Sequence, residues 1–362
     1  FTEESFAKEL IDTLMAGEKQ AIVEKVEKKK EKKNPPLLFN LAELQNLSSK
    51  LFKFSPDETL QIVQELYEKK LVTYPRTDAR VLSSAVAKEI HKNLHGLQQY
   101  PICCDLAGEI LQGESWKAIG STRYTNDKQI TDHYAIIPTG QGIAALKSVS
   151  LTAGKVYDCI VRRFLSIFYS PAVYQKVSIT TRIREESFFS SFKVLAEEGY
   201  LKVAGVPQKK TVQDSKNEDD NAQNLDAAFF QTVQALKKGM NLPVKALNIK
   251  EGETSPPKRY NSGSMILAME NAGQLIEDEE LRAQIKGSGI GTSATRAEIL
   301  KKLVNIKYLS LNKKTQIITP TLQGEMIYDV VNHSIRSLLN PELTASWEKG
   351  LNYVAEGDIT PD

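Results

Sequence analysis

Residues 71–78 read Leu-Val-Thr-Tyr-Pro-Arg-Thr-Asp and hold the densest group of reactive side chains in the sequence. Pro75 fixes its own φ and disfavours helix at the residue before it. The pattern therefore predicts that Tyr74 stands at the end of an extended segment and not inside a helix. In an extended chain, side chains two residues apart share a face, so Arg76 should lie beside Tyr74.

A phenol beside a guanidinium suits an attack on a phosphodiester. The tyrosine supplies the nucleophilic oxygen, and the arginine neutralises charge on the phosphate. Ionising an ordinary tyrosine at neutral pH costs roughly 4 kcal/mol, so nearby cations or a base must assist. The alternative interpretation is structural: Tyr74 ends a strand at a proline turn, and Arg76 is solvated.

The region around this segment, residues 37–141, has the apolar spacing of helices. Ser55-Pro56-Asp57-Glu58 predicts an N-cap with proline at the first helical position, and Ser83 opens a further helix. Residues 1–36 and 142–255 instead predict a β-rich domain.

Several patterns define that β-rich domain. The charge run from Glu27 to Lys33 indicates a solvated face or an edge strand guarded by lysine, and Asn34-Pro35-Pro36 ends it. Residues 173–183 and 188–195 alternate as strands do, with a turn at Glu185-Glu186. An amphipathic helix over 156–168 precedes them, and a polar loop over 209–226 follows.

The last region, residues 256–362, is again helical. Short helices are expected over 264–271 and 280–285, and the glycine-rich segment 287–291 should feed a helix from about residue 293 to 304. Residues 308–319 then indicate strand, turn and strand. Helices followed by a basic-tipped hairpin resemble a winged helix.

Two further motifs could carry chemistry. His133, within Asp132-His133-Tyr134, is one of four histidines, and it could bind a phosphate when charged or respond to DNA binding; a core-edge histidine is the alternative. Residues 287–296 predict a glycine turn entering a helix, with Thr292, Ser293 and Thr295 as candidate caps, a Thr295–Glu298 capping box and Arg296 in the first turn. A helix N-terminus there would attract phosphate, although a plain inter-helix loop also fits. No G-x-x-x-x-G-K-[ST] sequence occurs, so ATP hydrolysis is not expected.

Taken in order, these motifs resemble the type IA DNA topoisomerases, and within them the topoisomerase III branch. The resemblance covers nearly the whole chain. The segments that carry it are residues 71–78; Asp132-His133-Tyr134-Ala135-Ile136-Ile137-Pro138-Thr139; Pro257-Lys258-Arg259-Tyr260; residues 289–297; and Pro341-Glu342-Leu343-Thr344-Ala345-Ser346-Trp347-Glu348.

The resemblance implies an α+β multidomain chain, a toroidal core built from a β-rich arch, a helical domain bearing the tyrosine and a winged-helix-like domain that grips single-stranded DNA. Tyr74 would attack a backbone phosphate and hold the 5′ end, Arg76 would position that phosphate, and His133 would tune the site. The strand would pass and be resealed without ATP, because the phosphotyrosine ester keeps the energy of the broken bond. DNA contacts are expected at Thr77, Asp78, Arg259, Thr292, Thr295 and Arg296. Ser293 replaces the family's usual proline, with little expected effect.

The family's enzymes also carry a Toprim domain that holds Mg²⁺ through a glutamate and a D-x-D motif. This sequence has no D-x-D, so no metal ligands are expected here, and we expect a fragment that binds DNA without turnover. Zinc is not expected either, because Cys103, Cys104 and Cys159 form no C-x-x-C pair. The two functional alternatives are a non-catalytic clamp for single-stranded nucleic acid and a tyrosine recombinase, which the motif order disfavours.

The composition sets further limits. With 41% apolar and 25% charged residues the chain is not wholly disordered, and it contains no apolar run of about 18 residues or signal peptide. We therefore expect no membrane partner and a cytoplasmic, nucleoid-associated protein of bacterial type, acting as a monomer on single-stranded or underwound duplex DNA. The net charge of +2 requires a local basic patch for that binding.

Overall fold

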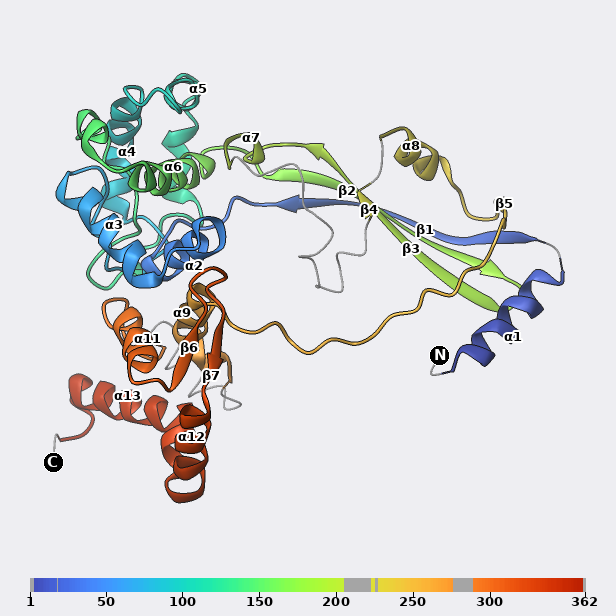
Figure 1. The fold of residues 1–362 in the computed structure, drawn as a ribbon. Coiled ribbons are helices and arrows are strands. Elements are labelled where there is room, and N and C mark those ends of the chain that lie inside the picture. The colour runs from blue at the N-terminus through green and yellow to red at the C-terminus, as the bar shows by residue number, and fades with distance from the viewer. Residues whose placement is uncertain (1–2, 18, 205–222, 225–226, 276–288, 361–362) are drawn as a thin grey trace. The chain divides into compact units, whose positions relative to one another are not determined.

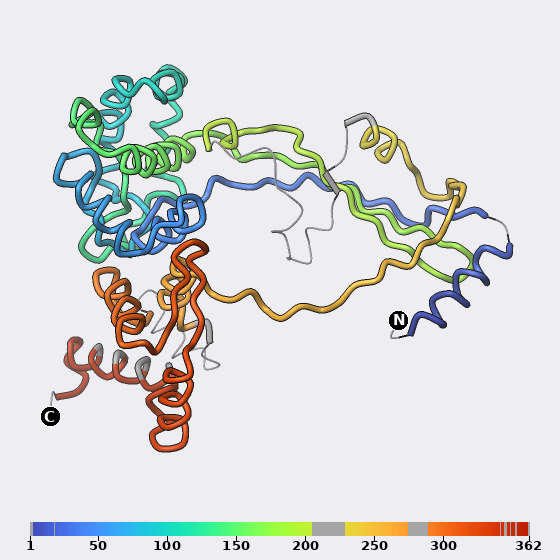
Figure 2. Tube along the Cα trace, in the orientation of Figure 1, coloured from blue at the N-terminus to red at the C-terminus, as the bar shows by residue number. Residues whose placement is uncertain are grey.

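The computed structural model describes residues 3–17, 19–204, 223–224, 227–275 and 289–360. The chain divides into two compact units, one of residues 1–35 and 169–256, the other of residues 36–168 and 257–362. The helix expected over 280–285 and the first two residues of the glycine-rich segment lie outside the described residues, as does most of the polar loop expected over 209–226. Figure 1 labels the elements, and Figure 2 follows the same chain as a tube.

The first unit is built on a mixed sheet. In the described part of the chain its strand order is β4-β3-β2-β1-β5, with β3 and β4 parallel and the other neighbours antiparallel. Its elements are α1 (Glu4–Met15), β1 (Gln20–Lys33), β2 (Ala172–Ile183), β3 (Glu186–Glu197), α7 (Leu201–Ala204), β4 (Gln223–Asn224), α8 (Ala227–Ala235) and β5 (Asn241–Pro243). The long strands β1, β2 and β3 run side by side in both views.

One face of this sheet holds the core. Val23, Val177 and Ile179 are buried against Phe230 and Val233 of α8. The lysine-rich half of β1 pairs with β2, whereas β5 pairs with β1 only at residues 20–22 of the described chain. The prediction of a lysine-guarded edge is therefore confirmed for this segment.

The second unit begins with helices. They are α2 (Leu41–Phe52), α3 (Pro56–Glu68), α4 (Ser84–Leu97), α5 (Cys104–Gln112), η1 (Ser115–Ser121), η2 (Asp127–Gln129), η3 (Ile143–Ser148) and α6 (Leu151–Ser166). The predicted caps are confirmed, because the Ser55 hydroxyl accepts from the Glu58 N–H in a capping box and the Ser83 hydroxyl accepts from the Val86 N–H.

The segment from residue 142 to 168, which the sequence assigned to the β-rich domain, belongs to this helical unit. The reason lies in α6, which starts earlier than expected at its cap Ser150 and buries Val156, Ile160 and Phe164. This apolar stripe is buried within the helical unit, where α6 packs on α3.

The C-terminal half of this unit consists of helices and one hairpin. They are α9 (Ser262–Glu270), η5 (Ala272–Leu275), α11 (Arg296–Asn305), β6 (Leu309–Leu311), β7 (Ile318–Pro320), α12 (Leu322–Ser334), η6 (Arg336–Leu339) and α13 (Pro341–Glu356). The predicted hairpin is confirmed as β6 and β7. Ala42 of α2 shares a core with Ile266, Leu300 and Ile318, so these elements are built onto the first helices of the unit.

A search of the described helices for an apolar segment of at least 18 residues that could cross a bilayer finds none.

Candidate active site

The Tyr74 segment lies outside any helix and is held by a neighbouring strand-like segment. The Thr73 N–H donates to the Ile137 carbonyl at 3.0 Å, and the Ala135 N–H donates to the Val81 carbonyl at 3.0 Å. Residues 135–137 are buried, so they form a fixed support. Tyr74 is therefore presented from a non-helical segment, as the sequence predicted, although the chain bends at Thr73 and Pro75.

Side chains alternate along this segment. Pro75, Thr77 and Ala79 are buried, whereas Tyr74, Arg76 and Asp78 are partly exposed. This period of two is the geometry of an extended chain. Tyr74 and Arg76 therefore both lie on the accessible side, as the sequence predicted.

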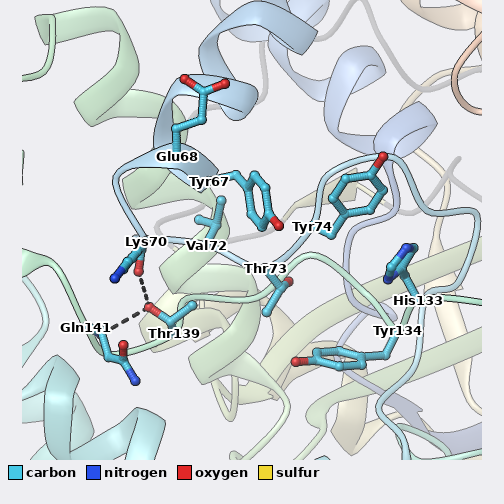
Figure 3. A pocket seen from close by; sticks show the side chains of 10 residues that line it. All are labelled: Tyr67, Glu68, Lys70, Val72, Thr73, Tyr74, His133, Tyr134, Thr139 and Gln141. Atoms are coloured by element: carbon cyan, nitrogen blue, oxygen red, sulfur yellow. Dashed lines mark hydrogen bonds between the residues drawn. The ribbon is translucent and has the colours of Figure 1, made fainter.

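Aromatic rings surround Tyr74. Its ring centroid lies 4.4 Å from that of His133, with the planes tilted by 43°, and 5.5 Å from that of Tyr67, which meets it edge-on (Figure 3). The hydroxyl of Thr77 donates to the carbonyl of His133 at 2.7 Å and ties the two segments together. The structure thus brings together the two predicted motifs at residues 74 and 133.

Arg76 is anchored by a residue that the sequence reasoning missed. Its Nη1 donates to Oε1 of Gln64 at 2.8 Å, and Nε2 of Gln64 donates to Oε1 of Glu68 at 3.0 Å. The sequence did contain a signal for this contact, because the helical spacing of residues 64, 67 and 68 places them on one face of α3. A guanidinium has five donors, so holding one edge orients the others.

A pocket of about 480 Å³ opens beside Tyr74. Its lining combines three tyrosines and an imidazole with polar groups and one valine (Figure 3). The lining residues are Tyr67, Glu68, Lys70, Val72, Thr73, Tyr74, His133, Tyr134, Thr139 and Gln141.

The glycine turn before α11 passes close to the end of α9. Gly289 has φ +61°, and a Cβ there would come within 2.5 Å of the Met269 and Glu270 carbonyls. Only glycine fits this position. The turn then leads to Arg296, the first residue of α11, where the sequence expected the helix from about residue 293.

The capping box predicted for Thr295 and Glu298 is wrong. Thr295 has φ −104° and ψ −24°, a right-handed conformation, and its side chain makes no cap hydrogen bond. Its hydroxyl instead accepts from the Thr292 N–H at 2.9 Å. A capping side chain needs an extended residue to reach forward along the helix, and the preceding turn does not provide one.

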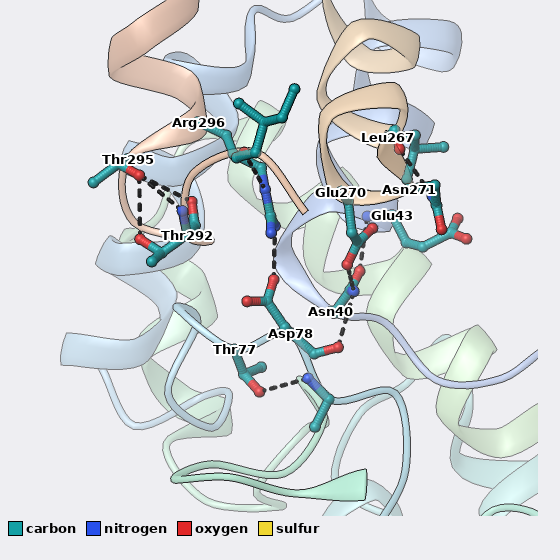
Figure 4. A network of polar contacts seen from close by, with 12 residues as sticks. Asn40, Glu43, Thr77, Asp78, Leu267, Glu270, Asn271, Thr292, Thr295 and Arg296 are labelled. Carbon is teal, nitrogen blue, oxygen red and sulfur yellow. Dashed lines mark hydrogen bonds and ion pairs between the residues drawn. The ribbon is translucent and has the colours of Figure 1, made fainter. Parts of the chain in front are cut away.

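Arg296 is buried, with 1% of its side chain exposed, and its Nη1 donates to Oδ1 of Asp78 at 2.8 Å. Asn40 joins this pair, because its Nδ2 donates to the Asp78 carbonyl at 3.1 Å and to Oε1 of Glu270 at 2.5 Å (Figure 4). Burial raises the pKa of the Glu270 carboxyl, and the charge of Arg296 opposes that shift. Two residues expected to contact DNA therefore contact each other.

The remaining predicted residues are accessible to different degrees. Thr292, Thr295 and Arg259 are exposed, whereas Thr77 is 4% exposed and bonded to the His133 carbonyl. Among the described residues, no group of three or more His, Cys, Asp or Glu side chains comes together as a metal site.

Comparisons with known protein families and structures agree with the geometry of this site. The profile of a family described as DNA topoisomerase matches residues 1–362. The full-length topoisomerase I structure from Thermotoga maritima superimposes with a TM-score of 0.65 at 22% identity, over 99% of this chain and 52% of that one. The chain belongs to the type IA DNA topoisomerase family. Its α+β fold is the fold that the resemblance to this family predicted.

Within the family the chain is similar to topoisomerase III proteins. It is 36% identical to DNA topoisomerase 3 of Bacillus subtilis and 35% identical to that of Bacillus licheniformis, each over 345 residues, 94% of this chain and 44% of the relative. The Bacillus cereus protein is 33% identical over 364 residues, 98% of this chain and 47% of the relative. The chain therefore spans less than half the length of these relatives.

Proposed function

We propose that these residues form the central core of a type IA DNA topoisomerase that cleaves one DNA strand through Tyr74, allows strand passage and reseals the break. The observation that carries the proposal is the setting of Tyr74. Its phenol stands on an accessible extended segment, beside the His133 ring and two residues from an arginine that Gln64 orients.

The proposed step is a transesterification. A bond forms between the Tyr74 oxygen and phosphorus, and the bond from phosphorus to the 3′ oxygen breaks. The phenol loses its proton, and the departing 3′ oxygen gains one. Arg76 stabilises the charge that grows on the phosphate, and His133 adjusts the charge beside the phenol.

Resealing reverses the same step. The 3′ hydroxyl attacks the phosphotyrosine, the Tyr74–phosphorus bond breaks, and the DNA bond returns. Because one ester replaces another, no ATP is required. The family implies Mg²⁺ for the complete enzyme, but the described residues offer no fitting ligand cluster, and the roles of Tyr74, Arg76 and His133 proposed here involve no metal.

The proposed substrate is single-stranded or underwound DNA, bound by a monomer in the cytoplasm. Arg259, Thr292 and Thr295 are exposed in the helical unit and are the proposed groove contacts. The proposed domains are the β-rich arch, the helical Tyr74 domain and the C-terminal winged-helix-like domain.

The proposal is tested by the covalent adduct. The natural full-length protein is incubated with a single-stranded oligonucleotide and Mg²⁺, denatured with detergent and separated by electrophoresis. Tyr74→Phe should abolish the adduct and keep DNA binding, whereas the matched variant Tyr67→Phe should keep both. DNA binding by the unmodified protein without any adduct would favour the alternative function, a non-catalytic clamp.

A further inference from the structure

We propose that the pocket beside Tyr74 is a stacking site for a nucleobase of the strand that Tyr74 retains, the first or second base after the cleaved phosphate. This inference rests on the proposed function. The pocket volume of about 480 Å³ lies within the range of about 300–1,000 Å³ that is usual for small-ligand sites.

The walls have the chemistry that a base requires. Tyr67 comes from α3, Tyr74 from the extended segment and Tyr134 from the next segment of the site, and all three line the same space (Figure 3). Tyr67 is 38% exposed, so its ring is open to a ligand. Aromatic rings stack on any base, because every base has a π-face.

Tyr134 adds a polar contact without charge. It is partly buried, and burial raises the pKa of its phenol above 10.0. The hydroxyl therefore stays protonated at neutral pH and can donate a hydrogen bond to a base edge. An uncharged phenol also avoids repulsion of the phosphates beside it.

The rim of the pocket supplies a cation. Lys70 has φ +60°, and its carbonyl accepts from the Thr139 hydroxyl at 2.5 Å, which fixes this backbone. Lys70 is exposed and is one of the lining residues, so its ammonium can meet the next phosphate of the strand. Glu68, the acidic group of the rim, is bonded to Gln64.

The position of Tyr74 determines which base of the strand can enter the pocket. The ring of Tyr74 is itself part of the lining, and its oxygen points away from Tyr134 and Thr139, so a strand joined to that oxygen begins at the edge of the pocket (Figure 3). The phosphotyrosine holds the 5′ phosphate, and the retained nucleotides follow it. Stacking them would keep the broken end aligned for resealing.

The test uses the 362-residue chain and a product mimic. The probe is a 5′-phosphorylated single-stranded oligonucleotide with 5-iodouracil at its first or second nucleotide, and the control probe carries it near the 3′ end. After irradiation, peptide mapping should find crosslinks to Tyr67 or Tyr134 for the first probe only. Crosslinks that map elsewhere would overturn the inference.

Affinity gives a second measurement. Tyr67→Leu and Tyr134→Leu should each weaken binding of the first probe roughly tenfold, because stacking of one base contributes about 1–3 kcal/mol. Tyr67→Phe keeps the ring and should stay within about twofold, as should the control Tyr328→Leu on α12, whose side chain is 56% exposed. Tyr134→Phe keeps the ring but loses the hydroxyl donor, so it should weaken binding less than Tyr134→Leu does. Unchanged affinity in both leucine variants contradicts the stacking site alone. A chain that binds no single-stranded DNA contradicts the proposed function as well.

Discussion

Removing one partner of the pair between Asp78 and Arg296 should cost the helical unit about 3 kcal/mol. Asp78→Ala removes the carboxylate that lies 2.8 Å from a guanidinium with 1% of its side chain exposed. Breaking a buried pair from one side costs about 3–5 kcal/mol. Asp78 is 33% exposed, and Nε of Arg296 also donates to the Ile290 carbonyl at 3.2 Å, so we expect the lower end, about 3 kcal/mol.

Tryptophan fluorescence measures this cost selectively. Both tryptophans, Trp116 and Trp347, belong to the helical unit, so urea unfolding followed by their emission reports on that unit. Asp78→Ala should lower the urea midpoint at an unchanged m-value. The double variant with Arg296→Met should recover part of the loss, because it no longer buries a charge without its carboxylate partner.

The matched control is the exposed pair between Asp57 and Lys301, which also joins α11 to an earlier segment. Its atoms lie 3.1 Å apart, but its side chains are 26% and 48% exposed. Asp57→Ala should therefore lower the urea midpoint much less than Asp78→Ala does, because solvent screens an exposed pair. The reasoning is refuted if Asp78→Ala costs no more than Asp57→Ala, or if the double variant is as unstable as the sum of its parts.

Three further predictions concern single residues. Arg76→Ala should slow cleavage by the full-length protein about 10²–10³-fold in a single-turnover assay. Arg76→Lys should recover only part of the rate, because a lysine cannot make the planar two-point contact. Equal rates for lysine and arginine would contradict this role. Because burial raises the pKa of the Glu270 carboxyl above its ordinary 4.5, the folded state binds that proton more tightly than the unfolded state. This stabilisation is complete below pH 4.5 and is lost as the pH rises through the folded pKa, so Glu270→Gln should flatten the pH dependence of urea unfolding there, and an unchanged profile would argue against it. Finally, Arg259→Ala should make the slope of log affinity against log salt for single-stranded DNA binding less steep by about 0.7 per lost phosphate contact. Arg296→Met, at a buried position, should leave that slope unchanged. The opposite pattern would return Arg296 to the DNA groove that the sequence predicted.

Local signals in the sequence were sufficient for much of this site. The proline after Tyr74 restricts the backbone on its own, and the serine caps at Ser55 and Ser83 act within three residues. Such features depend little on the rest of the chain, so they were predicted correctly. The capping box at Thr295 failed although its pattern is equally local, because the glycine turn before it sets the conformation of the cap residue.

Long-range packing could not be predicted in the same way. Asp78 and Arg296 are 218 positions apart, and both were predicted as DNA contacts because the family resemblance implied it. The two residues belong to segments whose neighbours Ala42, Ile266 and Leu300 share one core. Similarly, Gln64 reaches Arg76 only because α3 packs beside the extended segment.

The central claim is that Tyr74 holds the 5′ end of a cleaved strand, and one measurement tests it most directly. A single-stranded oligonucleotide labelled at either its 5′ or its 3′ end is cleaved by the full-length protein, and the adduct is digested and sequenced by tandem mass spectrometry. The account predicts that the 3′ label stays with the protein, that the 5′ label leaves on a fragment with a free 3′ hydroxyl, and that the phosphonucleotide is on Tyr74. Retention of the 5′ label, or a phosphonucleotide on any other residue, would contradict it.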